Sequence, residues 1–178
     1  REGGQPARIM SDSKLTPVLL KSVGFTSLLG SLLGYDIGII SGAIIFIERD
    51  LSLSSSQAEV IVGSLNLISA VGGLCAGAVA DQIGRKGAIG IASSLFIVGT
   101  ACMVLSSTFV GLLVGRMVMG LGVGCGFVVG PLYAAELAPP AVRGRLASLF
   151  EVAIGCGILL GYLVAFTCRD LPLGLGWR

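Results

Sequence analysis

The chain has 178 residues, of which 54% are hydrophobic and 12% are charged, and its formal net charge at neutral pH is +2. This much apolar surface exceeds what one soluble core can bury, so the composition indicates a protein of the lipid bilayer. The small net charge gives no reason to expect a nucleic-acid partner. The five cysteines are widely spaced and histidine is absent, so we expect neither a metal site nor a cofactor.

Stretches with few or no charges recur along the chain at the length that a helix needs to cross about 30 Å of hydrocarbon, roughly 20 residues. The sequence therefore predicts an all-α, polytopic membrane protein with five transmembrane helices. Their expected ranges are about 22–47, 60–80, 87–105, 109–135 and 146–167. Residues 1–21 are expected to form an amino-terminal segment outside the bilayer. Residues 168–178 are expected to begin a loop on the other side and to be cut short there, because both chain ends look like the ends of a fragment.

The distribution of lysine and arginine predicts the orientation, because cytoplasmic loops carry the excess of these residues. One side of the predicted bundle holds Arg1, Arg8, Lys14, Lys21, Arg85, Lys86, Arg143 and Arg145. The other side holds only Arg49, Arg169 and Arg178. We therefore expect a cytoplasmic amino terminus, and residues 168–178 are expected to be extracytoplasmic.

The first predicted helix carries glycines at four-residue spacing, Gly30, Gly34, Gly38 and Gly42. Small residues at this spacing form a stripe that lets another helix approach closely. Asp36 lies about 200° from Gly34, given about 100° per residue. The predicted packing face and the charged face of this helix are therefore different.

Two charges in the apolar runs lie at nearly the same predicted depth, Asp36 in 22–47 and Arg116 in 109–135. Asp36 is about 21 Å from the cytoplasmic end of its helix and Arg116 about 11 Å from the outer end of its own. Such charges are costly in a membrane and usually form pairs or line a watery cavity. Protonation of Asp36 would release Arg116, which links proton binding to helix rearrangement. A purely structural ion pair is the alternative.

Other polar residues stand near the predicted helix ends. Glu151 lies about five residues inside 146–167, where it can contact a ligand or reach the cytoplasmic surface. The pattern Gly77-x3-Asp81-x2-Gly84-Arg85-Lys86 joins 60–80 to 87–105, and glycine there allows a tight reversal. The pattern Pro131-x-Tyr133-x2-Glu136-x2-Pro139-x3-Arg143-Gly144 follows the fourth helix and combines helix breakers with an acid and a base. Its charges suit a cytoplasmic latch, provided that several of them act as a network.

The first of these patterns resembles the signature between helices 2 and 3 of the major facilitator superfamily. The second, with Gly34-Tyr35-Asp36, Ser41-Gly42, Gly115-Arg116 and the terminal Gly176-Trp177-Arg178, resembles the sugar porter family. Within this family, Gly34-Tyr35-Asp36-Ile37-Gly38 and Gly157-Ile158-Leu159-Leu160-Gly161-Tyr162 resemble the plant-type polyol and monosaccharide proton symporters most. The resemblance implies the major facilitator fold, with this chain as five helices of the amino-terminal six-helix half. It also implies a missing carboxy-terminal half, a sugar or polyol substrate, symport of protons and alternating access, with the plasma membrane expected rather than an internal membrane.

The resemblance further implies roles for single residues. Asp36 is the expected proton site, with Arg116 as its partner. Glu151 stands where many sugar porters have a substrate-binding glutamine; Ile154 and Ile158 match apolar substrate contacts, and Leu33 replaces an aromatic one. The implied gate network on the cytoplasmic side consists of Asp81, Arg85, Lys86, Glu136 and Arg143. A facilitative carrier, a non-transporting sugar sensor and another kind of facilitator, such as an antiporter, remain as alternatives. An enzyme is not expected, because no nucleophile, base and orienting group recur together.

Overall fold

The structure is a computed structural model that describes residues 17–140 and 142–168. Within these ranges all regular secondary structure is α-helical, and the helices are α2 (Pro17–Asp50), α3 (Ser55–Leu105), α4 (Phe109–Leu137) and α5 (Arg143–Cys168). Of the predicted amino-terminal segment 1–21, only residues 17–21 are described, and they belong to α2. Of the predicted loop 168–178, only Cys168 is described, as the last residue of α5. All four helices are long and apolar enough to cross a membrane.

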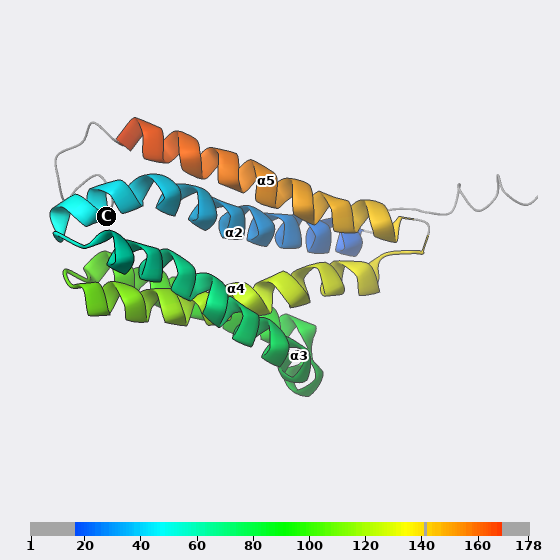
Figure 1. The fold of residues 1–178 in the computed structure, drawn as a ribbon. Coiled ribbons are helices and arrows are strands. Elements are labelled where there is room, and N and C mark those ends of the chain that lie inside the picture. Colours follow the sequence, from blue (N-terminus) through cyan, green and yellow to red (C-terminus); the bar gives the residue numbers. More distant parts are fainter. Residues whose placement is uncertain (1–16, 141, 169–178) are drawn as a thin grey trace, which may run out of the picture.

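Helix α3 takes the place of two predicted helices, 60–80 and 87–105. It begins at the N-cap Ser54, whose hydroxyl accepts a hydrogen bond from the Gln57 amide, and it has 51 residues. A straight helix of that length would measure about 77 Å. At Gly84, however, the backbone is non-helical, with φ 80° and ψ 159°, and the chain folds back (Figure 1). Glycine adopts a positive φ at little cost, so a single residue makes the turn and no loop separates the two helical parts.

The helices form two pairs, α2 along α5 and α3 along α4 (Figure 1). In the first pair the glycine stripe of α2 meets the backbone of α5. A Cβ added to Gly34 would overlap the carbonyl oxygen of Ile154, and one added to Gly38 would overlap that of Ile158. The contact is reciprocal, because a Cβ on Gly157 of α5 would overlap the Ser31 carbonyl. The predicted packing face of α2 is therefore its contact with α5.

Helix α4 holds the two pairs together and supplies much of the core. Met119, Val123 and Val129 are buried in one cluster with side chains of α2, α3 and α5. The helix runs through Pro131 and ends at Leu137, so the first half of the predicted latch pattern, including Glu136, is helical. A proline in a helix removes one backbone hydrogen bond, and here the helix continues for six residues beyond it.

Candidate functional site

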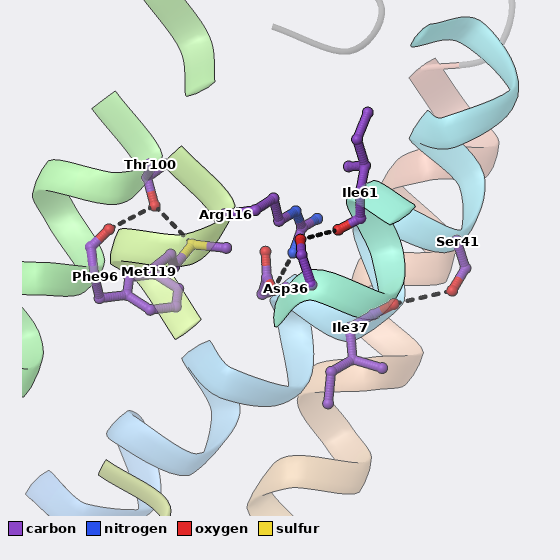
Figure 2. Close-up of polar contacts among 9 residues, drawn as sticks. Asp36, Ile37, Ser41, Ile61, Phe96, Thr100, Arg116 and Met119 are labelled. Atoms are coloured by element: carbon purple, nitrogen blue, oxygen red, sulfur yellow. Dashed lines mark hydrogen bonds and ion pairs between the residues drawn. The ribbon is translucent and has the colours of Figure 1, made fainter. Parts of the chain in front are cut away.

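An ion pair joins the two helix pairs near the middle of α2. The Arg116 Nη1 atom on α4 donates a hydrogen bond to the Asp36 Oδ2 atom on α2 over 2.9 Å (Figure 2). The arginine side chain is 2% exposed and the aspartate side chain 11%. Hydrogen bonds between ionised groups are about twice as strong as neutral ones, and loss of one partner of a buried pair typically costs about 3–5 kcal/mol. The pair therefore ties α2 to α4 as long as both groups are charged.

The guanidinium of Arg116 is not fully satisfied. Its Nε atom is buried and has no hydrogen-bond partner among the described residues. A buried donor without an acceptor costs about 1–3 kcal/mol, and more when the group is charged. The carboxylate is thus the one charged acceptor that holds this side chain, and loss of its charge would leave the guanidinium in need of another.

The predicted substrate contacts lie on α2 and α5 and differ in exposure. Glu151 is exposed, and Ile158 is half-buried. Leu33 and Ile154 are 2% and 7% exposed and lie in the central core cluster. The sequence did not predict this burial, because it depends on how α2 and α5 turn toward α4. In this arrangement a ligand has direct access to Glu151 and little access to Leu33.

A second group of charges gathers at the turn of α3 and the end of α4. Arg85 donates from Nη1 to the Asp81 carboxylate over 2.6 Å and from Nε to the Glu136 carboxylate over 3.2 Å. These three residues belong to the five that were predicted to form a network. The other two, Lys86 and Arg143, are exposed and form no ion pair within residues 17–140 and 142–168.

A groove of about 450 Å³ opens near this charged end, between α2, α3 and α4. Two lysines and a tyrosine stand at its polar part, and aromatic and aliphatic side chains form the rest. The lining includes Lys21, Phe25, Lys86, Ile89 and Tyr133. The groove is therefore separate from the predicted substrate contacts on α5.

Apolar helices of membrane-spanning length, joined by a buried ion pair, define an integral, multi-pass membrane protein. Comparison with known protein families makes the assignment specific. Residues 23–178 match the family described as "Sugar (and other) transporter". The chain belongs to this family of the major facilitator superfamily, whose members are transporters and not enzymes.

Individual relatives agree with the family. The chain is 43% identical over 152 residues to "Polyol transporter 5" of Arabidopsis thaliana. The matched region covers 85% of this chain and 28% of that protein. It is 38% identical to "Glucose transporter GlcP" of Staphylococcus epidermidis, over 84% of this chain and 33% of that protein. The xylose transporter XylE from E. coli, in its inward-open conformation, superposes with a TM-score of 0.78 at 28% identity, over 90% of this chain and 43% of that one. The chain thus spans about a third of the length of the curated relatives.

Proposed function

We propose that this chain is the amino-terminal part of a transporter that moves a sugar or polyol together with protons by alternating access. The observation that carries the proposal is the ion pair of Asp36 and Arg116, buried between helices of a sugar-transporter family. The printed names of relatives support the substrate class and the coupling. One relative is a polyol transporter, and XylE is described as a proton:xylose symporter.

The contacts around Asp36 offer a physical route from proton to substrate. Protonation of Asp36 removes the charge attraction between α2 and α4, and the two helix pairs are then free to move relative to each other. Gly34 and Gly38 flank Asp36 and contact the backbone at Ile154 and Ile158 on α5. Because these contacts involve backbone atoms directly, we expect a shift of α2 to reach the proposed substrate contacts on α5 undiminished.

We assign the substrate contacts to Glu151, Ile154, Ile158 and Leu33. The Glu151 carboxylate can accept hydrogen bonds from the hydroxyl groups of a sugar or polyol, and its exposure favours this role. Ile154 and Leu33 are buried, so they would meet substrate only in another conformation of the transport cycle. The remaining contacts would come from a carboxy-terminal half.

We assign a gating role to the charges around the turn of α3. Arg85, Asp81 and Glu136 are in contact, and Lys86 and Arg143 would join them together with residues of the second half in the outward-facing state. In this arrangement the two parts of α3, 60–80 and 87–105, are separate membrane crossings, which makes five crossings for the chain. The amino terminus and the charged turn would face the cytoplasm, with the plasma membrane as the expected location.

The experiment that tests the function measures uptake by a complete transporter that contains this chain. Labelled hexoses, pentoses, inositol and linear polyols would be offered in liposomes with and without a proton gradient. We expect saturable uptake of at least one of them, driven uphill by protons. Equal uptake with and without the gradient would support a facilitative carrier instead, and binding without any uptake would support a sensor.

The proton site is tested by Asp36→Asn in the same complete protein. We expect this change to abolish uphill uptake that depends on pH while some exchange of substrate remains, because the amide cannot take up and release a proton. Glu59→Gln is the matched control, since it makes the same chemical change at an exposed position of α3. Undiminished proton-driven accumulation by Asp36→Asn would exclude Asp36 as the coupling site.

A further inference from the structure

The unpaired edge of Arg116 raises the question of what the guanidinium binds when Asp36 is neutral. Arginine has five N–H donors and no acceptor, and in this structure Nη1 binds Asp36 while the buried Nε has no partner among the described residues. With a side chain that is 2% exposed, the arginine has little access to water. Before the helices move, an acceptor for the released guanidinium can come from a neighbouring helix.

The register between α3 and α4 identifies that neighbour. A Cβ on Gly120 would lie 3.0 Å from the Leu65 carbonyl oxygen, and one on Gly124 would overlap the Ser69 carbonyl, so both helices advance in the same direction along this contact. One turn earlier, Arg116 is opposite Ile61. In Figure 2 the guanidinium lies between the Asp36 carboxylate and the Ile61 carbonyl group.

The Ile61 carbonyl is already occupied. It lies within α3, where a helical carbonyl accepts the amide hydrogen four residues later, and it also accepts the Ser64 hydroxyl over 2.9 Å. A carbonyl oxygen has two lone pairs, so this one has no lone pair left for Arg116. The Ile61 carbonyl is therefore closed to the guanidinium as long as the Ser64 hydroxyl is bound to it.

We propose that Ser64 is a positioning residue for the pair of Asp36 and Arg116. When the Asp36 carboxylate is protonated, Ser64 supplies the guanidinium with hydrogen-bond acceptors. Rotation of the hydroxyl away from Ile61 frees one lone pair of that carbonyl and turns the serine oxygen toward Arg116. While Asp36 is ionised, the hydroxyl instead blocks the carbonyl and leaves the carboxylate as the sole partner. Ser64 therefore favours the protonated state, in which the helix pairs are released. This inference rests on the proposed function.

Among the described residues, the charged groups other than Asp36 and Arg116 stand mostly near helix ends. The acid nearest to Ser64 along the chain is Glu59, five residues away and exposed. The other charges of the packed helices lie near helix ends or at the turn of α3, apart from Glu151, which is exposed one turn or more inside α5. They are Lys21, Glu48, Arg49 and Asp50 on α2, Asp81, Arg85 and Lys86 on α3, Glu136 on α4, and Arg143, Arg145 and Glu151 on α5. The weaker acids on the described helices are Tyr35, Tyr133, Tyr162, Cys75, Cys102, Cys125, Cys156 and Cys168.

The test compares Ser64→Val with Ser64→Thr in the complete transporter and measures the pH dependence of proton-driven uptake. Valine and threonine have nearly the same shape, but only threonine keeps a hydroxyl that can bond within its helical turn. We expect Ser64→Val to move the midpoint of the pH profile of proton-driven uptake toward lower pH by about one unit. A shift of this size corresponds to the loss of one hydrogen bond to a charged group. Ser64→Thr should keep the wild-type midpoint.

Ser69 provides the matched control, because its hydroxyl donates to the Asn66 carbonyl over 2.9 Å in the same helix but away from the pair. Ser69→Val should leave the midpoint unchanged. Equal midpoints for Ser64→Val and Ser64→Thr would overturn the inference, whether both match the wild type or both shift. The proposed function fails separately, if Asp36→Asn still accumulates substrate against the gradient.

Discussion

Arg116 is the largest of the fully buried side chains in the described part of the chain, and its charge is balanced by a single carboxylate. Arg116→Ala would leave Asp36 buried without a partner, so we expect a loss of about 3–5 kcal/mol in the free energy of unfolding. Thermal unfolding of the complete protein in detergent would measure this loss. Arg145→Ala, at an exposed position, should change stability by less than about 0.5 kcal/mol.

The double variant Asp36→Asn with Arg116→Met separates charge from packing. This variant removes both charges, so no buried charge is left without its partner, and it should unfold at a higher temperature than Arg116→Ala. If Arg116→Ala unfolds at the same temperature as Arg145→Ala, the pair contributes little to holding α2 against α4.

At this scale the sequence was informative about the pair and less so about its surroundings. Helix length and the positions of Asp36 and Arg116 predicted that the two charges lie at one depth. In the structure the Arg116 Nη1 atom is 2.9 Å from the Asp36 Oδ2 atom. The burial of Leu33 and the hydroxyl bond of Ser64 were not predictable. Both depend on helix rotation and side-chain rotamers, and because many serines inside helices bond a carbonyl of their own turn, the residue type alone does not single out Ser64.

The contact of α2 with α5 depends on glycine, because a Cβ atom at Gly34, Gly38 or Gly157 would overlap the backbone of the facing helix. Gly34→Ala would place a methyl group against the Ile154 carbonyl, and the two backbones would have to separate. We expect it to lower the free energy of unfolding by about 1–3 kcal/mol. Gly155→Ala on α5 is the control, because a Cβ there meets nothing within 4 Å. Thermal unfolding of the two variants would compare them directly, and equal stability would show that the helices separate at no cost.

The helices themselves show where prediction from sequence ends. Hydropathy placed the fourth helix at 109–135, and α4 covers Phe109–Leu137. The same reasoning expected a loop between 80 and 87, whereas the structure makes the reversal at Gly84 within α3. Charge and glycine content mark a turn, but they do not say how many residues leave the helical conformation.

For the whole molecule, the exposed surface of the helices is itself apolar. Leu67 and Leu74 on α3 are 72% and 86% exposed, and Leu105 at its end is 83% exposed. Many other large apolar side chains of the described helices are exposed as well, and large exposed apolar patches on a protein usually mark contact with lipid or with another protein segment. The described helices therefore present apolar side chains that lipid or another protein segment would cover.

The proposed orientation is tested by labelling single cysteines in the complete protein after replacement of its native ones. Ser52→Cys lies between α2 and α3, next to the end with few basic residues, and Gln82→Cys lies beside the turn with Arg85; both positions are exposed. A membrane-impermeant maleimide should label Ser52→Cys in intact cells and Gln82→Cys only after permeabilisation, because the basic loop stays in the cytoplasm. The opposite pattern would place the Arg85 cluster outside the cell. It would then be unable to act as a cytoplasmic gate, although the Asp36 and Arg116 pair would keep its depth in the bilayer.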